Sequence, residues 1–160
     1  MIVIELRPFT PEDSSDIVAL WERARWDAQP WLEERMGYTH RDNVNFFENV
    51  LIPNNNVWVA SSDGATAGFL AMHEDEINFL YVDPPFQRGG VGSALLNQAR
   101  ELSPSGLSLY THQRNERARR FYEKSEFTIA AFGVSPAPES EPDVKYDWQP
   151  APAAADAGAS

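Results

Sequence analysis

Three glycines stand close together between two segments of opposite character, in the stretch Gln87-Arg88-Gly89-Gly90-Val91-Gly92-Ser93. A β-branched and aromatic run at 77–82 precedes the stretch, and an apolar pattern with helical spacing follows it. The first turn of a helix leaves backbone N–H groups unpaired, and glycine lets an anion approach them closely. The stretch therefore indicates a cradle for a phosphate or pyrophosphate. From these residues alone, a glycine-rich turn needed only for packing is the alternative.

Two common phosphate loops do not match the stretch. A P-loop requires a lysine followed by Ser or Thr directly after its last glycine, and none stands here. A Rossmann fingerprint requires Gly-x-Gly-x-x-Gly near the start of a parallel sheet. The glycines here are at 89, 90 and 92, and they follow a predicted hairpin.

A second segment that could carry chemistry begins at Asn115 and continues through Ala118, Phe121 and Tyr122, with Phe127 shortly after. The spacing is that of a short helix. Tyr122 is a potential proton donor, and a core tyrosine whose hydroxyl is satisfied elsewhere is the alternative.

Together the two segments resemble the GNAT superfamily of N-acyltransferases. Gln87-x-x-Gly90-x-Gly92 resembles the coenzyme A loop of that family, and the segment from Asn115 to Tyr122 resembles its second motif. The resemblance covers about residues 55–133. It departs from the family at Glu126, where glycine usually precedes the phenylalanine, and this departure concerns the shape of that turn.

The resemblance implies that acetyl-coenzyme A is the co-substrate and that it enters a gap between the fourth and fifth strands. Its pantetheine arm would pair with the edge of the fourth strand at 80–82, as a peptide adds to a sheet edge. Its pyrophosphate would lie on the amides of residues 88–93, and no metal is implied. The implied cofactor-binding residues are Leu80, Tyr81, Val82, Gln87, Arg88, Gly89, Gly90, Val91, Gly92, Ser93 and Asn115.

Acetyl transfer to an amine requires loss of a proton from an ammonium group of pKa about 10.4 and stabilisation of a departing thiolate. The resemblance makes Tyr122 the general acid at the coenzyme A sulfur. Glu76 has the offset of the catalytic glutamate of histone-acetylating relatives and is the candidate base; on a regular strand it shares a face with Asn78 and Leu80. A solvated turn carboxylate, with water or desolvation serving instead, is the alternative for Glu76, and His73 is the next candidate. Transfer is expected to be direct, because the chain has no cysteine.

The resemblance implies that the segment between the first two helices walls the acceptor site, and the aromatic side chains and carboxylates of this segment suit a small cationic amine. Packing of these aromatics under the sheet is the alternative. The residues concerned are Trp26, Asp27, Trp31, Glu33, Glu34, Met36, Tyr38 and His40.

Hydrophobic periodicity predicts the helices and strands that would position these residues. We expect an α+β fold, with a mostly antiparallel central sheet of about six to seven strands flanked by about four helices. The first helix starts at a Thr10–Asp13 capping signal and the second at a Thr39–Asp42 signal. The expected strands lie at 2–7, 57–60, 67–72, 77–82, 107–111, 127–132 and 144–148, and two further helices lie at 91–102 and 115–124.

Length and composition bear on the number of domains, the class of partner and the location of the protein. The 160 residues predict one domain, 1–149, with an Ala/Pro-rich tail at 150–160 that we expect to be disordered. The net charge of −11 argues against a nucleic-acid partner and a tRNA-acetylating toxin. No apolar run is long enough for a membrane span, so a cytoplasmic location is expected. A homodimer is one option for the oligomeric state. A non-catalytic acyl-coenzyme A sensor is the alternative function, against which Tyr122 argues.

Overall fold

The computed structural model describes residues 1–152 and contains a seven-stranded sheet in the order β1-β2-β3-β4-β5-β7-β6. All neighbouring strands are antiparallel except β4 and β5, which are parallel. The α+β prediction is confirmed. The strands are β1 (Ile4–Pro8), β2 (Asn56–Ser62), β3 (Ala65–His73), β4 (Glu76–Val82), β5 (Leu107–His112), β6 (Thr128–Val134) and β7 (Pro142–Trp148). The tail expected at 150–160 lies mostly outside the described residues.

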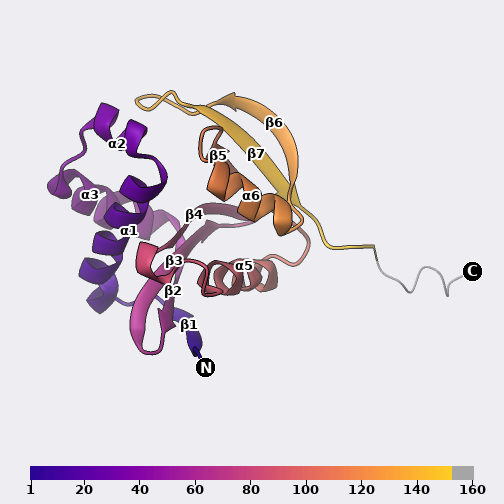
Figure 1. The fold of residues 1–160 in the computed structure, drawn as a ribbon, viewed down its shortest axis with the longest axis horizontal. Coiled ribbons are helices and arrows are strands. Elements are labelled where there is room, and N and C mark those ends of the chain that lie inside the picture. Colours follow the sequence, from indigo (N-terminus) through magenta and orange to yellow (C-terminus); the bar gives the residue numbers. More distant parts are fainter. Residues whose placement is uncertain (153–160) are drawn as a thin grey trace, which may run out of the picture.

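Helices cover both faces of the sheet (Figure 1). The group formed by α1, α2 and α3 lies on the side of the N-terminal strands, α5 lies beneath β3 and β4, and α6 follows β5. The α-helices are α1 (Ser14–Ala28), α2 (Pro30–Met36), α3 (His40–Phe46), α4 (Ile52–Asn54), α5 (Val91–Leu102) and α6 (Glu116–Lys124).

Helix α2 has no counterpart in the sequence prediction. Pro30 occupies its first turn, where the missing N–H costs nothing. Gly37 ends it in the left-handed conformation, with φ of 65°. Leu32 is fully buried, so one turn of helix anchors the segment between the two predicted helices.

Two hydrophobic clusters form the core, one on each face of the sheet. Leu70, Leu95 and Tyr146 belong to the cluster beneath α5 and α6. Ile17 and Phe69 belong to the cluster beneath α1. Strands β2, β3 and β4 therefore contribute side chains to both clusters, on alternate faces, as period-two packing requires.

Two apolar residues of the helical segments are exposed. Val50 is 44% exposed because a π-helical turn over Phe47–Leu51 changes the rotation of the chain at that point. Leu102 is 40% exposed because it is the last residue of α5, and Leu96 takes its place in the core.

A bulge in β4 changes which side chains share a face. Ala71 of β3 pairs with Phe79 and Met72 pairs with Ile77, so Asn78 is the extra residue. Glu76 therefore lies on the face of Phe79 and not, as predicted from a regular strand, on the face of Leu80.

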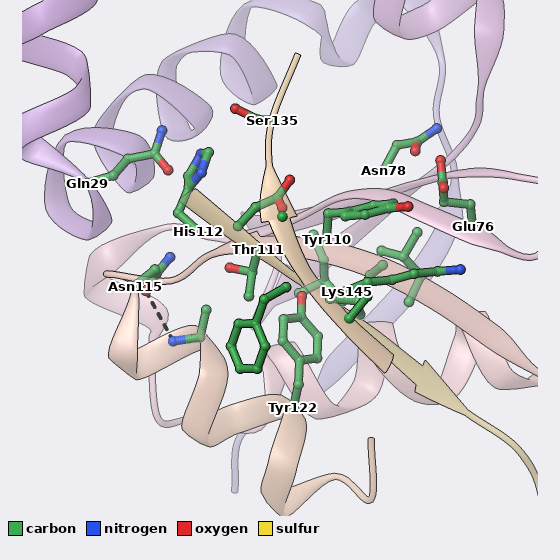
Figure 2. A pocket seen from close by; sticks show the side chains of 18 of the residues that line it. Gln29, Glu76, Asn78, Tyr110, Thr111, His112, Asn115, Tyr122, Ser135 and Lys145 are labelled. Carbon is green, nitrogen blue, oxygen red and sulfur yellow. Dashed lines mark hydrogen bonds between the residues drawn. The ribbon is translucent and has the colours of Figure 1, made fainter. Parts of the chain in front are cut away.

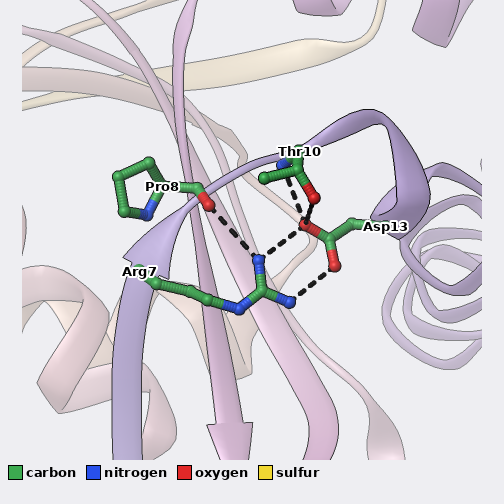
Figure 3. A network of polar contacts seen from close by, with 4 residues as sticks. All are labelled: Arg7, Pro8, Thr10 and Asp13. Carbon is green, nitrogen blue, oxygen red and sulfur yellow. Dashed lines mark hydrogen bonds and ion pairs between the residues drawn. The ribbon is translucent and has the colours of Figure 1, made fainter.

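The start of α1 is tied to β1 by a charged network (Figure 3). Two nitrogens of Arg7 donate to the two carboxylate oxygens of Asp13, at 2.8 and 2.6 Å. The Thr10 backbone N–H also donates to Asp13, at 2.9 Å, which confirms the predicted capping signal. The hydrogen bonds from Arg7, followed by those from Thr10, outweigh partial burial and lower the pKa of Asp13 to about 2.

We predict an acid-dependent loss of stability from this network. Because the pKa of Asp13 is lower in the folded than in the unfolded chain, its contribution is complete above about pH 4 and is lost as the pH falls toward 2. Asp13→Asn should lower the free energy of unfolding by roughly 1–2 kcal/mol near neutral pH, a figure reduced for the solvent around Arg7. Urea denaturation over this pH range measures the difference from wild type, which should vanish at the acid end. The exposed neighbour Asp16 provides the control Asp16→Asn, and an equal effect in both variants would contradict the assignment.

Candidate active site

The parallel strands β4 and β5 pair at only two positions, Glu76 with Ser108 and Ile77 with Leu109. Beyond Ile77 the two strands separate, and the backbone of β4 has no strand partner on that side among the described residues. Two cavities, of about 770 and 560 Å³, lie along the opening. The residues that line both are Leu80, Tyr81, Asn115, Ala118 and Tyr122. The opening is therefore continuous from one cavity to the other.

The smaller cavity ends at the N-terminus of α5. Gly90 precedes the helix with φ of 90°, and Arg88 also has a positive φ of 67°. The first bond of α5 runs from the Ala94 N–H to the Gly90 carbonyl, at 3.0 Å, so the amides before Ala94 have no partner within the helix. Gly90, Gly92 and Ser93 line the cavity. These unpaired amides stand where the sequence predicts an anion cradle.

Gln87, a predicted cofactor residue, uses its side chain to hold the loop. Its amide nitrogen donates to the Val82 carbonyl at 3.2 Å, and its amide oxygen accepts from Arg117 at 3.0 Å. Arg117 also donates to Asp27 of α1, at 2.7 Å. The loop is thereby joined to β4, α6 and α1.

Helix α6 is fixed at both ends. The Asn115 side chain accepts from the Ala118 N–H at its start, at 3.1 Å. At its end the Phe127 N–H donates to the Tyr122 carbonyl at 3.0 Å, and the Glu126 N–H donates to the carbonyl of Glu123 at 3.2 Å. This is a Schellman motif. Glu126, the departure from the family pattern, takes the left-handed conformation that glycine favours, with φ of 72°, so the turn is kept at a cost in strain.

Tyr122 is 7% exposed and lies where the two cavities meet. Its ring packs edge-on against Phe121 and Phe127, with centroids 5.2 and 5.5 Å away. Burial, and to a lesser degree the proximity of Tyr81, raises the pKa of Tyr122 above its ordinary value. Its hydroxyl therefore stays protonated at neutral pH and is a hydrogen-bond donor.

The predicted cofactor residues of β4 present the edge of their backbone to the opening, while their side chains point to the two faces of the sheet. Leu80 and Val82 face the α5 cluster, whereas the Tyr81 ring stacks on Phe69 on the opposite face. Burial raises the pKa of Tyr81 to about 12. The end of β4 is held to α1, because two nitrogens of Arg23 donate to the buried Asp83 carboxylate at 2.9 and 2.8 Å.

The larger cavity extends from Tyr122 toward α1 and the β6–β7 hairpin. In Figure 2 the Tyr122 hydroxyl points into it, with Gln29 and His112 toward one end and Glu76 toward the other. Glu76, the predicted base, is a lining residue, as is Lys145. His73, the other candidate, is exposed and does not line either cavity.

None of the eight residues predicted to wall the acceptor site lines either cavity. The Glu33 carboxylate is buried in an ion pair with Arg25, and Asp27 is paired with Arg117. These carboxylates are therefore already neutralised and are not free to hold a cationic acceptor. The same segment contributes Gln29 instead, at the junction of α1 and α2.

Among the lining residues that the sequence prediction missed, two polar ones lie side by side. His112 ends β5 and Asp143 is near the start of β7; the two are direct cross-strand partners. The alternation of polar and apolar residues at 107–112 places His112 on the polar face, but the partner strand is not readable from the sequence. Thirty-one positions separate the two residues.

In the part of the chain that the structure describes, no cluster of three or more His, Asp or Glu side chains could hold a metal ion. Within the same residues, none of the helices combines the length and the apolar character that crossing a bilayer requires.

Comparisons with known proteins agree with this geometry. A family model described as "Acetyltransferase (GNAT) domain" matches residues 53–129. The chain is 25% identical over 129 residues to the peptidyl-lysine N-acetyltransferase YjaB of Salmonella typhimurium, covering 80% of this chain and 86% of that protein.

Solved structures share the fold. The apo form of YjaB from Escherichia coli superposes with a TM-score of 0.74 at 23% identity, covering 91% of this chain and 97% of that one. The acetyltransferase yncA of Salmonella typhimurium, solved with acetyl-CoA, gives a TM-score of 0.66 at 16% identity, covering 91% and 93%.

The strained turn after α6 gives a second prediction. Glu126→Gly should raise the free energy of unfolding by roughly 0.5–1 kcal/mol, because glycine relieves the left-handed strain but loses more entropy on folding. Chemical denaturation measures the change. Glu126→Ala keeps the Cβ and should not stabilise the chain, so equal stability of the two variants would contradict the explanation.

Proposed function

From the premise that the chain belongs to the GNAT superfamily of acetyl-coenzyme A dependent N-acetyltransferases, we propose that Tyr122 and Glu76 handle the protons of the reaction. The acetyl group passes from acetyl-coenzyme A to a primary amine of a small molecule, peptide or protein. The observation that carries the proposal is the position of Tyr122, whose hydroxyl lies at the junction of the cofactor and acceptor cavities.

In the proposed reaction, the amine nitrogen attacks the thioester carbon, the C–N bond forms and the C–S bond breaks. Tyr122 donates a hydrogen bond to the departing sulfur and delivers a proton to it, which solvent then replaces. Glu76 accepts the proton that leaves the amine. The raised pKa of Tyr122 keeps the hydroxyl neutral over the whole working range, so that it can donate a hydrogen bond to the sulfur. The same shift makes the hydroxyl a weaker acid, so the proton moves only as negative charge develops on the sulfur.

The larger cavity supports the role of Glu76 as the base, but Glu76 cannot remove the proton without help. Glu76 lines the cavity, and no described residue forms an ion pair with it. A carboxylate is a weak base toward an alkylammonium, so removal of the proton also needs desolvation of the amine. Leu80 and Leu109 provide apolar wall for this.

The cofactor would occupy the smaller cavity. The β4 edge at 80–82 would pair with the pantetheine amides, because it has no strand partner on the side of the opening. The pyrophosphate would lie on the amides of residues 88–93. Asn115, which lines both cavities, would contact the pantetheine arm in addition to capping α6. A cytoplasmic location and a homodimer remain predictions from the sequence.

A sensor that binds acetyl-coenzyme A without catalysis is the competing proposal. It needs the amide cradle but not a proton donor between two cavities. The buried hydroxyl of Tyr122 and the large acceptor cavity favour the enzyme. A binding-only protein would show neither acetyl transfer nor a dependence on Tyr122.

We predict that Tyr122→Phe lowers kcat by about 10²- to 10⁴-fold and leaves the affinity for acetyl-coenzyme A unchanged. A thiol-release assay over a panel of amines measures kcat, and calorimetry measures the affinity. In the wild type, ionisation of Tyr122 should cause no loss of activity up to about pH 10, since its pKa is raised. Tight cofactor binding without thiol release in either protein would favour the sensor.

Glu76→Gln in the same assay separates the two proton roles. A base is needed most at low pH, so the variant should lose most activity on the acid side of the profile. Glu74→Gln, an exposed acid outside the cavity, is the matched control. A Glu76→Gln profile that matches the wild type would leave desolvation and water as the route for the proton.

A separate prediction concerns the cradle. Ser93 is exposed in the first turn of α5, where an added carboxylate suits the helix but repels a pyrophosphate. Ser93→Glu should weaken acetyl-coenzyme A binding by about tenfold or more, and Ser93→Gln should have a much smaller effect. Equal affinities of the two variants by calorimetry would place the pyrophosphate elsewhere.

A further inference from the structure

A buried carboxylate without a partner lines the acceptor cavity. Asp143 of β7 is 8% exposed, and no donor among the described residues lies within hydrogen-bond distance of its carboxylate oxygens. Apart from the pairing of its backbone in the sheet, Asp143 has one hydrogen bond in the described chain, in which its backbone carbonyl accepts from the Gln113 side chain. A carboxylate that is mostly buried, opens onto a cavity and receives no donor from the chain suits a ligand that supplies the missing donor.

His112 repeats this pattern on the neighbouring strand. Its Nδ1 atom is buried and has no hydrogen-bond partner in the described residues. As cross-strand partners, His112 and Asp143 have Cβ atoms about 5 Å apart on the same face of the sheet. Two polar groups that lack partners thus meet at one place on the cavity wall.

The backbone opposite leaves room for the carboxylate. Gly133 of β6 pairs with Asp143, and a Cβ atom at Gly133 would lie 3.3 Å from Asp143 Oδ1. Lys145 lies two residues further along β7 on the same face, about 7 Å away along the strand, and it forms no ion pair with Asp143. No cation of the described chain therefore neutralises Asp143.

Helix α2 contacts the chain segments next to His112 and Asp143, and none of its residues lines the cavity. Arg35 of α2 donates to the Glu139 carbonyl and to the Glu141 carboxylate in the β6–β7 connection, at 2.9 and 2.8 Å. Arg114 stacks over Trp31 of α2, 4.4 Å from the ring centroid. These contacts hold α2 against the segment that follows His112 and the segment that precedes Asp143.

We propose that Asp143 and His112 form a subsite for a second, positively charged nitrogen of the acceptor, so that the substrate class is a small diamine. The proposal rests on the proposed acetyltransferase function and adds the far contact of the acceptor. One ammonium group donates to Asp143, with His112 beside it, and the other nitrogen reaches Tyr122 and the thioester. Glu76 lies toward the other end of the cavity (Figure 2), so the anchored nitrogen and the base do not compete for one place.

The test compares linear α,ω-diamines of increasing length with linear monoamines of the same lengths. In the wild type, kcat/KM for the best diamine should exceed that for its matched monoamine by about 10- to 100-fold, the effect of one charge-assisted hydrogen bond. Asp143→Asn should reduce this ratio to nearly one by raising KM for the diamine, with little change for the monoamine. Asp147→Asn is the control, because Asp147 lies on the same face of β7 but does not line the cavity.

Several outcomes would overturn the subsite. One is an unchanged ratio in Asp143→Asn, and another is a lysine peptide that is acetylated better than every diamine and equally well by Asp143→Asn. If Asp143→Asn fails to fold, calorimetry of the wild type with coenzyme A decides, and equal affinities for diamine and monoamine would overturn it. Failure of the acetyltransferase function is distinct, because the wild type would then acetylate no amine while diamine binding could still be measured.

Discussion

The short parallel contact between β4 and β5 is the constraint on which the rest of the site depends. Only two residue pairs join these strands before they separate. The bulge at Asn78 bends β4 at that point, because one extra residue increases the local twist. Beyond it the N–H and C=O groups of β4 face an opening, and buried backbone groups require partners. The fold thus creates an unfilled sheet edge that an extended, amide-bearing cofactor arm can complete.

A sheet joined so weakly at its centre needs other links between its halves, and charged side chains supply them. Arg117 joins α6 to α1 across the opening, whereas Arg23 fixes α1 to the end of β4 within the N-terminal half. Arg35 joins α2 to the β6–β7 connection. Most of these pairs are partly exposed, so each contributes little to stability. Their geometry matters more, because the helices span an opening that no ladder of hydrogen bonds closes.

Sequence reasoning predicted the parts of the fold that depend on local chemistry. The Thr10 and Thr39 capping signals and the glycine loop depend on residues within a few positions of one another. It failed where distant segments meet. The bulge at Asn78 is set by pairing with β3, and the approach of His112 to Asp143 requires the strand order. The roles proposed for Tyr122 and Glu76 came from the family resemblance, and the structure adds which cavities they line.

An acceptor site for a cation faces a conflict that the arrangement of charges addresses. A carboxylate close to an ammonium group favours the charged form and therefore opposes the attack of its nitrogen on a thioester. The conflict disappears if the carboxylate binds one nitrogen of the acceptor and a different nitrogen, at a separate position, attacks the thioester. Asp143 is on β7 beside His112, whereas the hydroxyl of Tyr122 opens into a region with apolar walls from Leu80 and Leu109. A nitrogen held there loses water and with it part of its preference for the charged form, so the length of the acceptor becomes the quantity that the cavity selects.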